Sequence, residues 1–213
     1  MKQEHIVLVG ATGLTGRLVL DLLLAHPRCG RLTILVRKEI DLVHPKLGQV
    51  VCDYRTFRAE LVPVCDRVFC CLGTTIKVAG SKEVFEAVDR DYPVAVAKAA
   101  FEGGAKVFSI ITAIDSSATS RVFYSKVKGL CEEDLRAIGY EGLVILRPSM
   151  LLGARKERRV AERIGQVVME ALAFMIPARY KAVKASCVAE VLVGEGMEDV
   201  KGVRVIESEG IRC

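Results

Sequence analysis

The most constraining feature of this chain is a glycine-rich turn close to its amino terminus. Residues 7–16 read V-L-V-G-A-T-G-L-T-G, an apolar run that leads into Gly10, Gly13 and Gly16. Glycine adopts positive φ angles without steric cost and lets another group approach the backbone closely. Residues 13–26 then show an amphipathic helix pattern, and the amino-terminal N–H groups of a helix attract anions. This setting predicts a site for the diphosphate of a dinucleotide, with a purely structural glycine turn as the alternative.

Strand and helix patterns alternate along residues 1–148, which predicts repeated strand–helix units. Strands are expected at residues 5–10, 31–37, 49–52, 67–72, 106–112 and 142–147, and helices at residues 13–26, 81–102 and 121–138. The strands are almost continuously apolar, as strands are when helices cover both faces of a parallel sheet. The sequence therefore predicts an α/β fold with a doubly wound parallel sheet.

The pattern changes after Pro148, which interrupts the sixth predicted strand. Helices are expected at residues 157–175 and 186–195, and a last strand at residues 203–207. We therefore predict a single domain with a cofactor-binding core at residues 1–148, and with a small substrate-side lobe and the final strand at residues 149–213. A lobe of about sixty residues leaves room for a small or open pocket only, which disfavours an epimerase or dehydratase acting on a sugar nucleotide.

The composition is that of a globular protein, because 213 residues with 51% hydrophobic content suffice to bury a core. No apolar run reaches the length of a membrane span and the first residues carry no signal-peptide pattern, so a soluble cytoplasmic protein without a membrane partner is expected. The eight cysteines fall mostly within or beside apolar segments and the three histidines are scattered. Reduced, mostly buried thiols in a reducing compartment and no metal site are therefore predicted.

Much of the net charge of +5 comes from residues 155–163, which read R-K-E-R-R-V-A-E-R. Aromatic residues that would stack on bases do not interleave with these charges. We interpret the stretch as a solvated helix face and expect no nucleic-acid partner.

The ends of the predicted strands supply the expected cofactor contacts, because a ligand of a doubly wound sheet lies over the carboxyl ends of its strands. Arg37 and Lys38 stand at the end of the second predicted strand, where basic residues neutralise the 2′-phosphate of NADP, so NADPH is favoured over NAD. An exposed strand-end arginine without this role is the alternative. Asp53 is placed either to accept a hydrogen bond from adenine or to cap the next turn. The predicted cofactor-binding residues are Gly10, Thr12, Gly13, Leu14, Thr15, Gly16, Arg37, Lys38, Asp53, Leu72, Gly73, Thr74, Tyr124, Lys128 and Pro148.

Tyr124 and Lys128 form the second chemical motif, since a spacing of four places both on one face of a helix. A free tyrosine titrates near pH 10, and a lysine ammonium stabilises the phenolate. Tyr124 is therefore predicted to protonate a carbonyl oxygen as hydride arrives, with an interfacial tyrosine on an amphipathic helix as the alternative. Thr112, at the end of the fifth strand, is expected to donate a hydrogen bond to the substrate oxygen. Less well placed hydroxyls are those of Ser109, Ser116 and Ser117.

The motifs G-A-T-G-L-T-G, a strand-end Val-Arg, C-L-G-T-T, V-D-R-D-Y, Y-x-x-x-K followed by Gly129, and L-R-P-S-M-L-L-G together resemble those of the atypical short-chain dehydrogenase/reductases. Within this class the chain is most similar to the small Tat-interacting-oxidoreductase-like group and its bacterial relatives, over almost its whole length. The resemblance implies an NADPH-binding Rossmann fold, with Tyr124 as proton donor and Lys128 holding the cofactor. It places Pro148, Ser149 and Met150 beside the nicotinamide.

Two positions depart from this pattern. Thr112 and Ala113 stand where related sequences often have serines, and Asp89 stands where many enzymes with a water-linked proton relay have asparagine. The expected function is an NADPH-dependent oxidoreductase that reduces a small carbonyl compound, as a monomer or homodimer. The alternative is a non-catalytic NADPH-binding regulator that acts through protein partners.

Overall fold

The computed structural model describes residues 2–152 and 177–213 of the chain. Its main sheet has seven parallel strands in the order β3-β2-β1-β4-β5-β6-β9. The strands are β1 (Glu4–Val9), β2 (Cys29–Val36), β3 (Leu47–Val51), β4 (Arg67–Cys70), β5 (Val107–Ile111), β6 (Gly142–Arg147) and β9 (Gly202–Glu207). The strand order reverses between β1 and β4, so the prediction of a doubly wound α/β sheet of the Rossmann type is confirmed.

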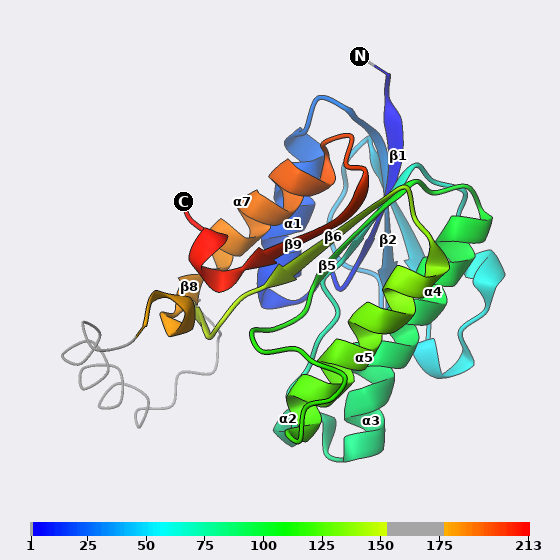
Figure 1. The fold of residues 1–213 in the computed structure, drawn as a ribbon. Coiled ribbons are helices and arrows are strands. Elements are labelled where there is room, and N and C mark those ends of the chain that lie inside the picture. The colour runs from blue at the N-terminus through cyan, green and yellow to red at the C-terminus, as the bar shows by residue number, and fades with distance from the viewer. Residues whose placement is uncertain (1, 153–176) are drawn as a thin grey trace.

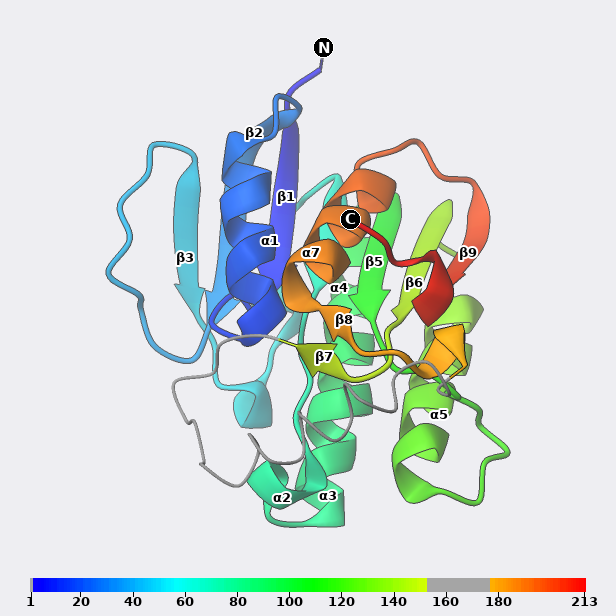
Figure 2. The same ribbon diagram turned by 90° about the vertical axis from the view of Figure 1, so that its left-hand side faces the viewer.

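Helices cover both faces of this sheet. On one face lie α1 (Leu14–Ala25) and α7 (Ala185–Gly196), and on the other lie α4 (Tyr92–Glu102) and α5 (Phe123–Ile138) (Figures 1 and 2). Because successive side chains of a strand point to opposite faces, β1 contributes to both cores. Ile6 and Leu8 pack in the core that α1 and α7 share, whereas Val7 and Val9 pack in the core under α4 and α5.

The single helix predicted at residues 81–102 is divided in the structure. It begins as α3 (Lys82–Glu86), passes through a π-helical turn at Ala87–Asp91 and continues as α4. Short elements that the sequence did not predict are α2 (Ile76–Ala79), β7 (Leu151–Leu152) and β8 (Val183–Lys184). The helix predicted at residues 157–175 lies outside the described residues.

The described carboxyl-terminal part of the chain completes the sheet and its helical cover. Helix α7 packs against α1, and β9 pairs in parallel with β6. Helix α7 and strand β9 therefore complete the main sheet and its cover, and β9 lies where the last strand was expected.

The cysteines differ in one respect from the prediction. Cys29, Cys52, Cys65, Cys70, Cys71 and Cys131 are free, and all but Cys71 are buried. Cys187 and Cys213, however, form a disulfide, which corrects the expectation of reduced thiols at these two positions. Strand β9 returns the end of the chain to the first turn of α7, a proximity that a sequence separation of 26 residues does not reveal.

Candidate functional site

The glycine turn between β1 and α1 has the geometry expected of a tight, exposed cradle. Gly10 has φ +82°, and a Cβ atom built on it would lie 2.5 Å from the carbonyl oxygen of Cys71. A Cβ atom on Gly16 would lie 2.0 Å from the Gly10 oxygen, so a side chain at either position would displace backbone. Gly13 precedes α1 without a side-chain cap, and Gly13 and Thr12 are exposed. The turn therefore leaves the positive end of α1 open to an anion.

The other strand ends that were predicted to contact a cofactor lie along the same carboxyl edge of the sheet. The Arg37 and Lys38 side chains are exposed just after β2, and nothing in the described part of the chain pairs with either. The Asp53 carboxylate accepts a hydrogen bond from the backbone N–H of Arg55 at 3.0 Å, which is the capping role that the sequence left open. Leu72 is half-buried after β4, and Gly73 is exposed.

Tyr124 and Lys128 both lie on α5, one helical turn apart. The half-buried Tyr124 ring packs against the buried ring of Phe85 from α3, with centroids 5.4 Å apart. The loop before α5 packs closely at Gly129, where a Cβ atom would lie 2.1 Å from the Ser117 carbonyl carbon. Glycine directly after Lys128 is therefore required for the loop to reach the helix, which explains this part of the Y-x-x-x-K-G motif.

Lys128 is almost fully buried, and its ammonium is paired with a buried carboxylate. Its Nζ atom lies 2.7 Å from Oδ1 of Asp89. The other oxygen of Asp89 accepts a hydrogen bond from the backbone N–H of Thr74 at 2.9 Å. Burial by itself lowers the pKa of Lys128, but Asp89 and Tyr124 outweigh it and raise the pKa above its ordinary value. Lys128 therefore remains an ammonium group beside Tyr124.

Thr112 has a different environment from the one its predicted role requires. Its hydroxyl is buried and donates a hydrogen bond to Oε1 of Glu132 at 2.7 Å. A hydroxyl has a single proton to donate, so Thr112 presents no donor to a substrate in this arrangement. The other hydroxyl candidates are also unavailable to a substrate at this edge. Ser109 is fully buried inside β5. The Ser116 hydroxyl donates to the Ala113 oxygen, and the Ser117 hydroxyl shares a hydrogen bond with Thr119 in the exposed loop.

Glu132 and Arg147 are the residues near the site that sequence reasoning missed. Arg147 binds both carboxylate oxygens of Glu132, with Nε 3.0 Å from Oε1, and its Nη1 atom lies 2.8 Å from Glu207. These contacts raise the pKa of Arg147. The signal was present, because Glu132 follows Lys128 at the same four-residue spacing that joins Lys128 to Tyr124. The network ties α5 to the carboxyl ends of β6 and β9.

Pro148 follows β6 and is buried, and its carbonyl accepts a hydrogen bond from the Ile114 N–H at 2.9 Å. This bond links the segment after β5 to the segment after β6. The neighbouring Ser149 N–H donates to the Ser208 hydroxyl, and Met150 is exposed. The structure therefore places Pro148 at the carboxyl edge with the other predicted contacts.

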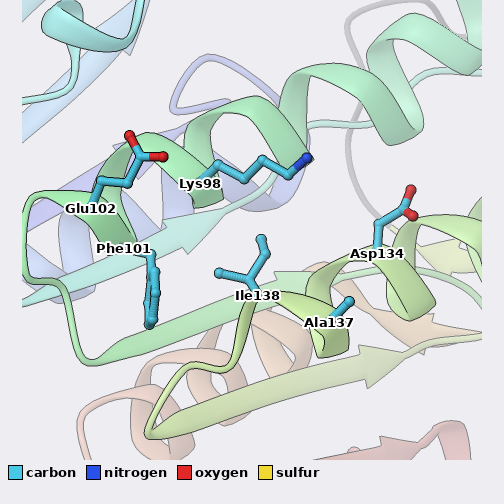
Figure 3. A pocket seen from close by; sticks show the side chains of 6 residues that line it. All are labelled: Lys98, Phe101, Glu102, Asp134, Ala137 and Ile138. Atoms are coloured by element: carbon cyan, nitrogen blue, oxygen red, sulfur yellow. The ribbon is translucent and has the colours of Figure 1, made fainter.

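A shallow groove of about 410 Å³ lies elsewhere, between the outer surfaces of α4 and α5 (Figure 3). Phe101, Ile138 and Ala137 line it together with charged side chains. The groove is at the carboxyl ends of both helices, and helices that connect parallel strands end near the amino edge of the sheet. It is therefore separate from the carboxyl-edge site.

Solved structures of low sequence identity share this fold. "MoeE5 in complex with UDP-glucose and NAD" aligns with a TM-score of 0.72 at 13% identity, covering 95% of this chain and 75% of that one. Uronate dehydrogenase from Agrobacterium tumefaciens aligns with a TM-score of 0.69 at 15% identity, covering 97% and 76%. Fold and motifs together define an atypical short-chain dehydrogenase/reductase.

Comparison with curated proteins narrows this class. The chain is 36% identical to "Protein FMP52, mitochondrial" of Eremothecium gossypii, over 97% of this chain and 95% of that protein. It is 31% identical to "Protein HTATIP2" of Rattus norvegicus, over 76% of this chain and 69% of that protein. No protein-family model matches the sequence. The chain belongs to the family of the FMP52 and HTATIP2 proteins.

The relatives overturn the expected cellular location. The FMP52 proteins of Eremothecium gossypii, Emericella nidulans and Coccidioides immitis are all named as mitochondrial. These names contradict the cytoplasmic expectation, which is therefore wrong. Within residues 2–152 and 177–213, no helix has both the length and the apolar character needed to cross a bilayer.

Proposed function

We propose that this protein is an NADPH-dependent oxidoreductase that reduces a small carbonyl compound with Tyr124 and Lys128. The observation that carries the proposal is the buried Lys128 ammonium, which lies beside Tyr124 at the same edge of the sheet as the glycine turn. A buried cation with an adjacent phenol is an arrangement suited to proton transfer. The family and the shared fold support the same class of protein.

The residues at the carboxyl edge fit a nicotinamide dinucleotide. The turn at Gly10 and Gly16 admits no Cβ atom, and the uncapped start of α1 suits a diphosphate. The exposed Arg37 guanidinium, which has no partner in the described residues, suits the additional phosphate of NADPH. When bound, NADPH supplies the hydride for the carbonyl carbon.

Tyr124 supplies the proton in this proposal. Its Oη–H bond breaks as a new O–H bond forms on the carbonyl oxygen, which leaves a phenolate beside the Lys128 ammonium. That cation stabilises the phenolate until solvent returns a proton. Lys128 also has N–H donors left over from its bond to Asp89, and we assign them to the ribose hydroxyls of the cofactor.

A second candidate function is NADPH binding without catalysis, in which occupancy of the site alters a surface that binds another protein. The specific observation in its favour is the Thr112 hydroxyl, which is bonded to Glu132 and leaves the substrate oxygen without the expected second donor. In this case the glycine turn and Arg37 keep their roles, and Tyr124 has none in chemistry.

Substitution of Tyr124 by Phe distinguishes the two functions. If Tyr124 is the acid, turnover with a panel of aldehydes and ketones falls by about 10²–10⁴-fold, while NADPH affinity stays near the wild-type value. NADPH oxidation is followed by absorbance, and binding is followed by calorimetry. Tyr140→Phe is the matched control, because this tyrosine follows the other end of α5 and its hydroxyl donates to the Ala97 oxygen, away from the carboxyl edge. Equal turnover in wild-type protein and Tyr124→Phe would remove the catalytic assignment.

A further inference from the structure

Asp89 has no assigned role so far, yet its carboxylate joins two parts of the site. One oxygen is 2.7 Å from Lys128 Nζ, and the other accepts the backbone N–H of Thr74 at 2.9 Å. The residue is 1% exposed and lies in the π-helical turn between α3 and α4. Such turns are rare and occur frequently at functional sites. The π-helical turn therefore places the Asp89 carboxylate in contact with both α5 and the loop after β4.

Gly73 lies directly over this ion pair. A Cβ atom built on Gly73 would be 3.6 Å from Oδ1 of Asp89 and 3.7 Å from Nζ of Lys128. Gly73 is itself exposed. The ion pair therefore lies just under Gly73, which forms part of the surface proposed to bind the dinucleotide.

The charges that face Lys128 come from three elements. The π-helical turn contributes Asp89, α5 contributes Tyr124 and Cys131, and β4 contributes Cys70. Burial raises the pKa of the Cys70 thiol to about 12 and also raises that of Cys131, so both thiols are neutral at physiological pH. One turn further along α5, the Glu132 carboxylate is neutralised by Arg147. In the described part of the chain, Asp89 is thus the negative charge that balances Lys128.

We propose that Asp89 is a positioning residue that fixes Lys128 and the Gly73–Thr74 backbone to each other and offsets the charge of Lys128 beside the Tyr124 hydroxyl. This inference rests on the proposed function, in which Tyr124 is the proton donor. An unbalanced ammonium favours loss of the phenolic proton to solvent. The Asp89 carboxylate offsets this charge through its contact with Lys128 Nζ.

Two substitutions distinguish the charge of Asp89 from its hydrogen bond to Thr74. Asp89→Asn removes the negative charge but retains an oxygen that accepts the Thr74 N–H. Asp89→Ala removes both the charge and the acceptor. NADPH affinity is therefore expected to stay near wild type in Asp89→Asn and to fall several-fold in Asp89→Ala, measured by calorimetry.

The electrostatic part is tested by titrating Tyr124 without nucleotide or substrate. Tyrosine labelled with ¹³C at Cζ is followed by NMR, and the Tyr124 signal is assigned with Tyr124→Phe. In Asp89→Asn, proton loss from the coupled Tyr124–Lys128 pair is expected to move to lower pH by on the order of one pH unit. Asp91→Asn is the matched control, because it changes the same residue type at an exposed position of the same turn.

An unshifted titration in folded Asp89→Asn, or an equal shift in Asp91→Asn, would overturn the proposal. The titration needs no bound cofactor and no turnover, so it is independent of the proposed function. If only the proposed function is wrong, Asp89→Asn still shifts the Tyr124 titration, but the wild-type protein neither binds nor oxidises NADPH.

A double-mutant cycle provides a second test if Asp89→Asn is too unstable for the titration. Loss of one partner leaves the other charge buried alone, whereas Asp89→Asn with Lys128→Met removes both charges. Thermal unfolding is expected to show a smaller loss of Tm in the double variant than in either single variant. Additive losses would contradict the direct pairing on which the proposal depends.

Discussion

Two buried cations at opposite edges of the sheet differ in how many of their N–H donors are used. Arg67 lies in an amino-edge cluster with Glu4, Arg28 and Asp199, and Lys128 pairs with Asp89 at the carboxyl edge. At the amino edge, Arg67 bonds to both oxygens of Glu4, to Asp199 and to the carbonyls of Gly196 and Glu198. These contacts use all five N–H donors of a guanidinium. At the carboxyl edge, Lys128 has three donors and, within the described residues, a single acceptor in Asp89.

This difference separates a structural cluster from a site. In the amino-edge cluster, Arg67 joins β1 and β4 to the end of α7 and has no N–H donor left for a ligand. The carboxyl-edge pair lies beneath an exposed glycine and beside a half-buried tyrosine, with donors to spare. A buried charge is therefore informative about function only when its unused hydrogen-bonding capacity is counted.

The largest effect expected from this comparison is the loss of stability when Arg67 is replaced. Arg67→Met leaves Glu4 with one remaining partner, Arg28, and is expected to reduce the free energy of unfolding by about 3–5 kcal/mol. NADPH affinity of the folded fraction should not change, because the cluster lies at the opposite edge. Urea unfolding and calorimetry measure the two quantities. The control is Arg204→Met, whose exposed pair with Glu195 should contribute about 0–1 kcal/mol. A large loss of NADPH affinity in Arg67→Met would remove the distinction between the two edges.

A smaller effect is expected from Arg37 at the carboxyl edge. Arg37→Ala should weaken NADPH binding by about 1.5–3 kcal/mol, the range of a charge-assisted hydrogen bond, and leave NADH binding and stability almost unchanged. Calorimetric titrations with both nucleotides provide the comparison. Arg31→Ala is the control, because this exposed arginine lies near the start of β2, away from the site. Equal losses for NADPH and NADH would show that Arg37 does not contact the 2′-phosphate.

The smallest effect concerns the exposed member of the amino-edge cluster. Hydrogen bonds from Arg28 and Arg67 lower the pKa of Asp199 below its ordinary value. Asp199 therefore stabilises the fold above the pKa of the unfolded chain, near pH 4, and this contribution is lost as pH falls through the lower folded value. In Asp199→Asn, Tm should be slightly lower at neutral pH and fall less steeply in acid. Parallel Tm-against-pH curves for the variant and wild type would contradict this linkage.

The sequence predicted the periodic parts of the fold well. Strand β6 has the predicted ends, and α5 begins two residues after its predicted start, because apolar periodicity directly reports burial in a sheet or helix. The interruption of α3 and α4 by a π-helical turn was not predicted, since one inserted residue leaves an almost unchanged apolar pattern. The pairing of Cys187 with Cys213 depends on the return of β9 and has no local signature.

In the candidate site, too, the sequence predicts what depends on local patterns but not what depends on contacts between elements. The glycine turn, Tyr124 and Lys128 are motifs with fixed spacing, so their common position at the carboxyl edge follows from the fold. The partners of Thr112 and Lys128 are not fixed by spacing, because Glu132 and Asp89 reach them across elements. Sequence reasoning therefore identified these two side chains but not which groups use their hydrogen bonds.

Hydrogen–deuterium exchange with and without NADPH is the most direct test of the central claim that the carboxyl edge holds a dinucleotide. NADPH should slow exchange at residues 10–16, 72–75 and 124–128 and leave the amino-edge residues 196–199 unchanged. Unaltered exchange at residues 10–16 in the presence of saturating NADPH would contradict the account.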